Sequence, residues 1–480
     1  MHTGVSLLIA KHFWTSVFKS RSLYLLFGIV VLLLLYAAYS GLQYHKHNDS
    51  RTDHQELARK SWENNPDKHP HRMAHFGSFA FRLKHPLSIF DFGIESYTGN
   101  AVFLEAHKQN MVNFSEASFS TSLLRFGELS MAMVLQTLLP LIIFFLGYTS
   151  IASDREQGTL TIMLTQGASW KEILFGKSLG LLGIAILFTL PFLLITLALL
   201  ITGGHATADT WMRFGLISIT YLLFTCILCL TSIGVSASSQ TSKHALTKLL
   251  GIWLLMVVLI PRTSQALGTY FHPSPNKLEF RSVVEEEVIQ TGDSHNPNDP
   301  LFNALRDSVL AAHQVDSVTQ LPFNYGGFVM GQGEKLSSQI YLKHHNWLLD
   351  QYRKQNQLTR LMALVNPYLA IKHVSMAISA SDFESYVDFQ QQAESYRYQL
   401  AQRMNELQMK YISTKKISGS EGKVHVVNRA EWKAFPDFHH HNLPLRFAIR
   451  NEALSLLSIL LWTFLSIGAL MHLSRKAKAI

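Results

Sequence analysis

Six long apolar stretches constrain this chain more than any other feature of its sequence. A helix needs about 20 apolar residues to cross the hydrocarbon core of a bilayer. Five stretches of about that length carry no charged side chain, and the sixth, residues 249–261, is lengthened by residues 244–248 if Lys248 reaches the membrane surface. The sequence therefore predicts a mainly α-helical, polytopic membrane protein with spans at residues 23–42, 129–152, 178–202, 214–237, 244–261 and 453–471.

The lysines and arginines orient these spans. With both termini in the cytoplasm, the inner side carries eleven basic and three acidic residues, and the short outer loop 203–213 is neutral. This arrangement follows the rule that cytoplasmic loops are enriched in basic residues. The net charge of +9 is then a signal of topology, and we expect no nucleic-acid partner because no basic cluster lies in a soluble segment.

The N-terminal residues 1–22 show apolar positions at near-helical spacing, among them Val5, Leu8, Phe13 and Val17. The pattern predicts a cytoplasmic amphipathic helix at the inner headgroup layer. The apolar stretch that follows is longer than the 7–15 residues typical of a signal peptide, so we interpret residues 23–42 as an uncleaved anchor. The remaining cytoplasmic pieces are the loop 153–177, the loop 238–243 and the tail 472–480.

Two long insertions form the extracytoplasmic part. Residues 43–128 open with a polar, histidine-rich stretch, and residues 262–452 are the largest soluble segment. In the second insertion, apolar positions from Phe383 to Tyr411 recur every three or four residues, which predicts a long amphipathic helix with Ser381 as N-cap. A second helix is predicted over residues 334–365, and the glycines at 326, 327, 331 and 333 are assigned to a loop. We expect a largely helical domain.

The cytoplasmic loop 153–177 is the most informative segment for function. Gly158 interrupts the second span, residues 159–164 can form a short helix with an apolar face, and Ser169 can cap the helix that leads into the third span. Such a short helix suits docking to a cytosolic partner. From spacing alone, a plain connecting loop is an equally good interpretation.

Two sets of residues resemble a known family. Residues 156–160, followed by residues 173–174 and 176–177, resemble the first cytoplasmic loop of type-2 (ABC-2) ABC transporter permeases, although residues 166–168 stand where members often have a proline turn. Residues 86–91 together with 102–110 resemble a subgroup of these permeases with large extracytoplasmic insertions of undefined function.

The resemblance implies a function. It implies an exporter permease in a bacterial inner membrane, paired as a homodimer or heterodimer, whose loop contacts a separate ABC ATPase subunit. The coupling residues it implies are Asp154, Arg155, Glu156, Gly158, Thr159, Leu160, Leu164, Ser169 and Lys177. Charge reversal at Glu156 or truncation of Leu160 is then expected to weaken coupling without unfolding the chain.

The sequence carries no motif for chemistry of its own. Gly176-Lys177-Ser178 resembles the end of a phosphate-binding loop, but residue 171 is lysine where that loop needs glycine. We therefore expect no cofactor and no catalytic residue. The alternative to transport is a membrane-anchored assembly or sensing protein whose outer helices bind a partner.

Several polar and small residues within the spans invite a specific role. Gln136 can line a pathway or bond to a neighbouring helix, and the second role is favoured. Gly176, Gly180 and Gly183 can allow close helix contact. The two cysteines, Cys226 and Cys229, are interpreted as packing residues because thiolates are costly in a bilayer.

Histidines are concentrated in the two insertions, with a run at 439–441 and a group at His69, His71 and His75. A metal site needs three or four converging ligands, and adjacent histidines on a loop rarely converge. We therefore expect these side chains to be solvated or packed, with no metal site.

Overall fold

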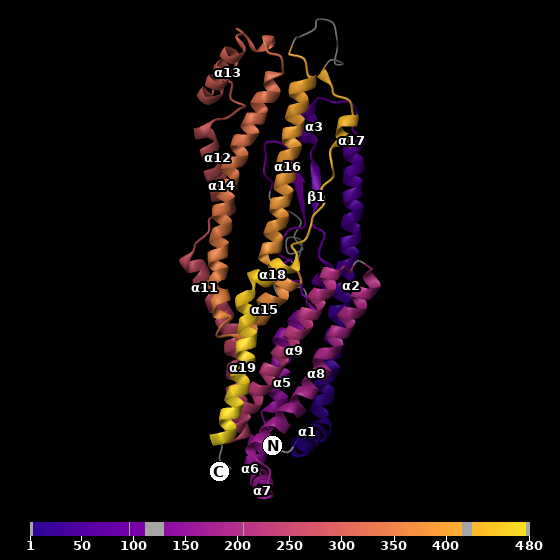
Figure 1. Ribbon diagram of the computed structural model, residues 1–480, viewed down its shortest axis with the longest axis vertical. Helices are drawn as coiled ribbons and strands as arrows, with labels where there is room; N and C mark the ends of the chain where they lie inside the picture. Colours follow the sequence, from indigo (N-terminus) through magenta and orange to yellow (C-terminus); the bar gives the residue numbers. More distant parts are fainter. Residues whose placement is uncertain (1–2, 96, 111–128, 205, 415–424, 477–480) are drawn as a thin grey trace.

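The computed structural model describes residues 3–95, 97–110, 129–204, 206–414 and 425–476. Residues 111–128 of the first predicted insertion and residues 477–480 of the predicted tail lie outside this part. The molecule is elongated, with a helix bundle at one end and long helices with a small hairpin at the other (Figure 1). Six helices are long and apolar enough to cross a membrane, which confirms the predicted mainly α-helical polytopic class.

The bundle end holds these helices. They are α1 (Thr3–Phe18), α2 (Arg21–Glu63), α4 (Met131–Met133), η4 (Val134–Leu138), α5 (Leu139–Gly147), α6 (Ala152–Glu156), α7 (Thr159–Thr165), α8 (Trp170–Gly203), α9 (Ala208–Ala237), α10 (Ser242–Trp253), η5 (Leu254–Leu259) and α19 (Ala453–Lys476). The helix α11 (Ile260–Phe271) continues from η5 toward the other end (Figure 1).

The other end is built from the two insertions. It holds α3 (Pro70–Phe76), β1 (Ser78–Phe81), η1 (Pro86–Ile89), β2 (Ala101–Leu104), α12 (Lys277–Thr291), α13 (Pro300–His313), η6 (Val318–Gln320), α14 (Tyr325–Met362), α15 (Pro367–Ile378), α16 (Phe383–Tyr411), α17 (Ala430–Ala434) and α18 (Leu445–Asn451). The two strands pair antiparallel, with Ser78 opposite Leu104.

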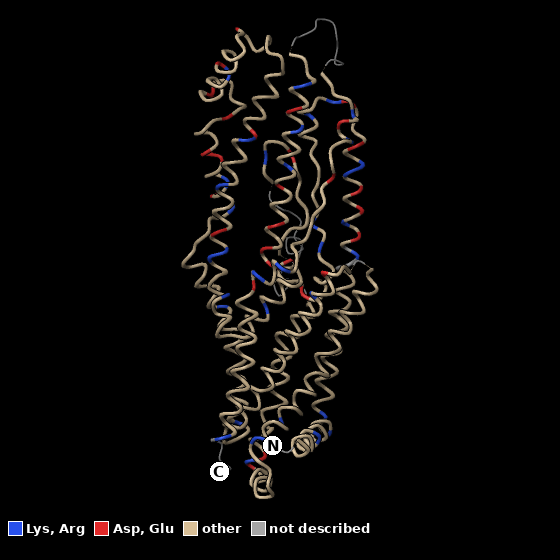
Figure 2. The backbone as a smooth tube through the Cα atoms, in the orientation of Figure 1, with Lys and Arg blue, Asp and Glu red and all other residues tan. Residues whose placement is uncertain are grey.

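Charge separates the molecule along its long axis. Charged residues are concentrated in the insertions and at the far tip of the bundle, and the backbone between them contains almost none (Figure 2). Both termini lie at the bundle end, beside α6 and α7 (Figure 1). The part with almost no charged residues matches the helix segments of highest hydropathy, as expected of the part that lies in lipid.

The helix α2 is longer than predicted. The expected span ends at residue 42, but α2 continues as one helix to Glu63, through the stretch that was interpreted as merely polar. Ion pairs one turn apart, Arg59 with Glu63 and Lys60 with Glu56, support the polar half. Its end is fixed by Trp62, whose Nε1 donates to the Trp432 carbonyl oxygen at 2.9 Å.

Two spans widen into a π turn just before a proline. The turn η4 precedes Pro140, and η5 precedes Pro261. Proline cannot donate a backbone hydrogen bond, and its ring clashes with the carbonyl four residues earlier. A widened turn relieves that clash, so both helices continue through their prolines.

The long outer helices confirm some predictions and correct others. The predicted bounds of α16 are confirmed, but its N-cap is Asp382, which accepts from the Ser385 backbone N–H, so the assignment to Ser381 is wrong. The assignment of residues 326–333 to a loop is also wrong, because α14 begins at Tyr325. A Cβ at Gly327 would lie 2.7 Å from the Met409 backbone nitrogen, so glycine there lets α14 approach α16 closely.

Candidate functional site

The helices α6 and α7 form the tip of the bundle and contain most of the predicted coupling residues. Gly158 joins them with a φ of +76°, a conformation that glycine adopts without strain. The predicted short helix from Thr159 is confirmed as α7. Thr159 Oγ1 donates to the Asp154 carbonyl oxygen at 3.1 Å, which closes the corner between the two helices.

The start of α8 has the predicted cap. The Ser169 hydroxyl accepts from the Glu172 backbone N–H, and the Glu172 carboxylate accepts from the Ser169 N–H at 2.9 Å, forming a capping box. The Glu172 side chain is buried. The exit from α7 is therefore fixed in direction.

Charged side chains of α6 hold the tip to three neighbouring helices. Asp154 Oδ2 lies 2.7 Å from Nζ of Lys177 on α8. Arg155 donates to the Ala237 carbonyl oxygen at 2.8 Å and to that of Ser239, at the end of α9. Glu156 accepts from the Ser242 backbone N–H at 3.1 Å, at the start of α10. The positive charge of Arg155 therefore lies at the C-terminus of α9, and the negative charge of Glu156 lies at the N-terminus of α10. Both placements are favourable to the helix dipole.

The apolar residues of α7 point in two directions. Leu160 is fully buried in the bundle core, and Leu164 is half-buried against it. Ile162 on the opposite face is 53% exposed. The expectation that Leu160 can be truncated without harm to the fold conflicts with its burial. The exposed residue that sequence reasoning missed is Ile162, because spacing gives an apolar stripe without saying which neighbours cover it.

The N-terminal helix α1 packs along α8 next to this tip. A Cβ at Gly176 would lie 2.7 Å from the Ser6 carbonyl oxygen, and those at Gly180 and Gly183 would meet Phe13 and Trp14. Trp14 Nε1 donates to the Gly180 carbonyl oxygen at 2.7 Å. The predicted close contact at these glycines is confirmed, and its partner is α1.

A buried polar network lies where the spans meet the insertions. Gln136 Nε2 donates to Tyr221 Oη at 2.6 Å, which confirms a bond to a neighbouring helix. It also lies 3.5 Å from Asp91, which accepts from Ser375 on α15 and from the Gly93 backbone N–H. Burial raises the pKa of Asp91. The network joins both insertions to two spans.

A second contact of this kind involves Arg213 near the start of α9, at the end of this helix that faces the insertions. Its buried guanidinium donates to the Ile378 carbonyl oxygen at 2.8 Å, at the end of α15, and pairs with Asp209. Asp209 in turn accepts from the Leu445 backbone N–H at 3.0 Å, at the start of α18. The outer helices α15 and α18 are therefore fixed to α9.

Histidines of the first insertion come together at the insertion end of the molecule. Nitrogen atoms of His71, His75 and His107 all lie within 4.8 Å of one another. The prediction that the histidines of this stretch do not converge is wrong, because α3 places two of them one turn apart and the turn after β2 supplies a third. Burial and the neighbouring imidazoles lower the pKa of His71 to about 4.

The three histidines of the run 439–441 differ in burial. His439 and His441 are exposed, whereas His440 is almost fully buried against the Phe389 ring. Burial and the nearby Arg82 lower the pKa of His440 to about 4.

The thiols of Cys226 and Cys229 are both free, on α9.

Comparison with known proteins gives two kinds of similarity. Residues 277–441 match the model of a domain of unknown function (DUF3526). The chain is also 29% identical, over 141 residues, to the "Probable ABC transporter permease protein NosY" of Stutzerimonas stutzeri, and 30% identical, over 124 residues, to the protein of the same name from Pseudomonas aeruginosa.

These alignments are partial. They cover 29% and 25% of this chain, and 51% and 45% of the two relatives, so the chain spans about half the length of the curated relatives it matches. They support a likeness to ABC transporter permeases in a chain whose six apolar helices are those of a membrane protein.

Proposed function

We propose that this chain is the membrane-spanning subunit of an ABC exporter of the ABC-2 type. A separate ATPase subunit hydrolyses ATP and docks on α7. Its movement drives either transport or conformational work by the extracytoplasmic insertions. Two permease chains, identical or related, sit on the ATPase pair in a bacterial inner membrane, with both termini in the cytoplasm.

The observation that carries this proposal is that α6 and α7 are bonded to several neighbouring spans. A plain connecting loop would not require such bonds. Here Asp154, Arg155 and Glu156 bond to α8, α9 and α10, while Ile162 remains exposed. A partner that pushes on α7 therefore moves three spans together. The same end holds both termini, in keeping with the even number of spans (Figure 1).

The opposite ends of these spans carry the motion outward. On α9, Tyr221 lies within hydrogen-bond distance of Ser375 at 2.9 Å, and Arg213 holds the end of α15. Both contacts connect α9 to α15, a helix of the second insertion. The other end of α9 is bonded to Arg155 of the tip. An ATP-driven displacement of the tip can therefore be transmitted through α9 to α15 by a continuous series of hydrogen bonds. A tenfold change in the ratio of two conformations needs about 1.4 kcal/mol of differential binding.

The test is a purification of the full chain in mild detergent from the membranes of its host, followed by identification of co-purifying chains and an ATPase assay. We expect a stoichiometric ATPase subunit. The variant Ile162→Asp should reduce its recovery about tenfold or more, because burial of such a side chain contributes about 1.5–3 kcal/mol.

The matched control is Leu278→Asp on α12. This residue is 74% exposed and belongs to the second insertion, so its replacement should leave ATPase recovery unchanged. Full recovery with Ile162→Asp would contradict docking on α7. If no ATPase accompanies the wild-type chain but an extracytoplasmic protein does, the assembly or sensing interpretation replaces the exporter.

A further inference from the structure

The histidine cluster at the insertion end, formed by His71, His75 and His107, has the arrangement of a metal site. His71 and His75 are four residues apart on α3, so both side chains project from one face of the helix. His107 lies in the turn that follows β2. The ring centroids are 4.7 Å apart for His71 and His75, and 5.5 Å from each of these to His107.

The third imidazole is held in a defined orientation. Glu334 on α14 accepts from the His107 backbone N–H at 2.9 Å, and its carboxylate lies 3.2 Å from Nδ1 of the same residue. With the Nδ1 proton directed at Glu334, the lone pair is on Nε2. That atom is buried and has no hydrogen-bond partner among the residues that the structure describes. A carboxylate behind a histidine ligand is the usual second contact in metal sites.

The support for His107 extends further into the second insertion. Glu334 is fully buried, and Arg397 on α16 pairs with it at 2.7 Å. His107 itself has a φ of +62°, which is uncommon for a residue other than glycine and occurs where the surroundings impose it. The fold therefore uses a buried ion pair and a strained backbone to keep this ring in place.

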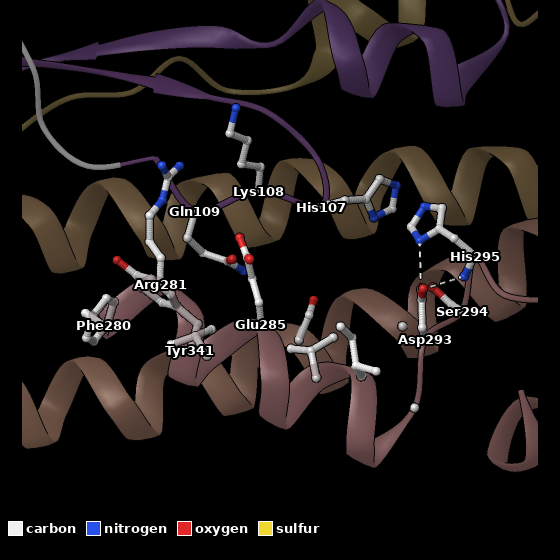
Figure 3. A pocket seen from close by; sticks show the side chains of 16 residues that line it. His107, Lys108, Gln109, Phe280, Arg281, Glu285, Asp293, Ser294, His295 and Tyr341 are labelled. Carbon is white, nitrogen blue, oxygen red and sulfur yellow. Dashed lines mark hydrogen bonds and ion pairs between the residues drawn. The ribbon is translucent and has the colours of Figure 1, made fainter. Parts of the chain in front are cut away.

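The cluster is open to a cavity on one side. His107 and His295 border a cavity of about 450 Å³ between α12, α14 and the turn after β2. The ring of His295 lies edge-on to that of His107, with centroids 4.9 Å apart, and its Nδ1 is 3.4 Å from Asp293 (Figure 3). A further ligand or a water molecule can approach His107, the one proposed ligand that borders this cavity.

We propose that His71, His75 and His107 bind a divalent transition-metal ion of the zinc class, with a fourth position open to an external ligand. Three imidazoles without a carboxylate or thiolate suit zinc, copper or nickel, whereas calcium and magnesium need oxygen ligands. Three protein ligands with an open position are a known zinc arrangement. The exposed His75 side chain can close the remaining distance by a change of rotamer.

A bound ion would join parts of the chain that are far apart in sequence. It would link α3 directly to the turn after β2, and through Glu334 and Arg397 to α14 and α16. This inference does not depend on the proposed transport function, since it concerns the outer part alone.

The test uses the full chain purified in detergent with a tag that contains no histidine. The protein is stripped with a chelator, equilibrated with Zn²⁺ and analysed for metal content and for affinity by competition with a chromophoric chelator. We expect one zinc ion per chain. His71→Ala combined with His75→Ala should abolish this binding, and His75→Ala alone, at an exposed position, should weaken it at least about tenfold.

The matched control combines His439→Ala with His441→Ala, since both side chains are exposed and outside the cluster. It should bind zinc as the wild-type chain does. Loaded with Co²⁺, the wild-type chain should show the absorption of a four-coordinate ion, absent from the His71/His75 variant. Wild-type chain without zinc, unchanged binding in the folded His75→Ala and double variants, or equal loss in the control would each overturn the proposal.

Discussion

At the residue scale, two neighbours on α7 differ in what surrounds them. Leu160 is fully buried, and Ile162, two positions later, is 53% exposed. A helix of seven residues turns these side chains to nearly opposite faces. The same apolar character therefore serves the fold at one position and is available to a partner at the other.

This difference gives a stability prediction. Leu160→Ala should lower the free energy of unfolding by about 2–5 kcal/mol, because it removes buried methyl groups and leaves a cavity. Ile162→Ala should change it by no more than about 0.5 kcal/mol, as is usual at the surface. Thermal unfolding of both variants in the same detergent measures this. Equal shifts would contradict the assignment of the two faces.

Local residue patterns were predictable and distant partners were not. The cap at Ser169 follows from residues three positions apart, and sequence alone identified it. The partners of Arg155 and Glu156 lie more than 80 residues away, on α9 and α10. His107 was missed as a partner of His71 for the same reason, because no local spacing relates the two.

At the scale of whole helices, periodicity predicted α16 correctly and failed where composition was misleading. The bounds of α16 follow from its apolar positions. The polar half of α2 and the glycine-containing start of α14 were not assigned to helix from their composition. Tertiary packing overrides this intrinsic preference: α14 packs on α16, and the polar half of α2 packs on β1 and α17.

The contact between α1 and α8 gives a prediction at this scale. Gly176→Ala places a Cβ 2.7 Å from the Ser6 carbonyl oxygen, so α1 must move away from α8. We expect lower thermal stability and faster trypsin cleavage after Lys11. Gly251→Ala on α10 is the control, because nothing lies within 4 Å of its Cβ, and alanine is favoured over glycine in a helix by about 0.5–1 kcal/mol. Matching digestion rates in both variants would contradict a close contact.

At the scale of the whole molecule, the network around Asp91 joins the spans to the insertions. It contains a residue of the first insertion, Gln136 and Tyr221 from two spans, and Ser375 from the second insertion. The sequence indicated each segment but not their meeting point, since the four residues are spread over nearly 300 positions. Folding of either insertion by itself would leave this network incomplete.

Replacement of Asp91 tests that junction. Asp91→Ala should lower the free energy of unfolding by about 1–3 kcal/mol, because Gln136 and Ser375 lose a buried acceptor. Asp91→Asn should lose less than the alanine variant, because its amide oxygen can still accept from Ser375 and Gln136, although its NH2 group cannot accept from the Gly93 N–H. Thermal unfolding in detergent compares the two. An alanine variant as stable as the asparagine variant would contradict a structural role for the network.

The unbroken helix α2 has a mechanical consequence. Its 43 residues correspond to about 65 Å, roughly twice the thickness of the hydrocarbon core. We expect its polar half, residues 43–63, to act as a stiff arm of about 30 Å that ends in the Trp62–Trp432 contact. A tilt of about 5° in the bilayer would then displace that contact by almost 3 Å. A long rigid helix of this kind converts a small rearrangement among the spans into a displacement of a few ångströms at the Trp62 end of α2.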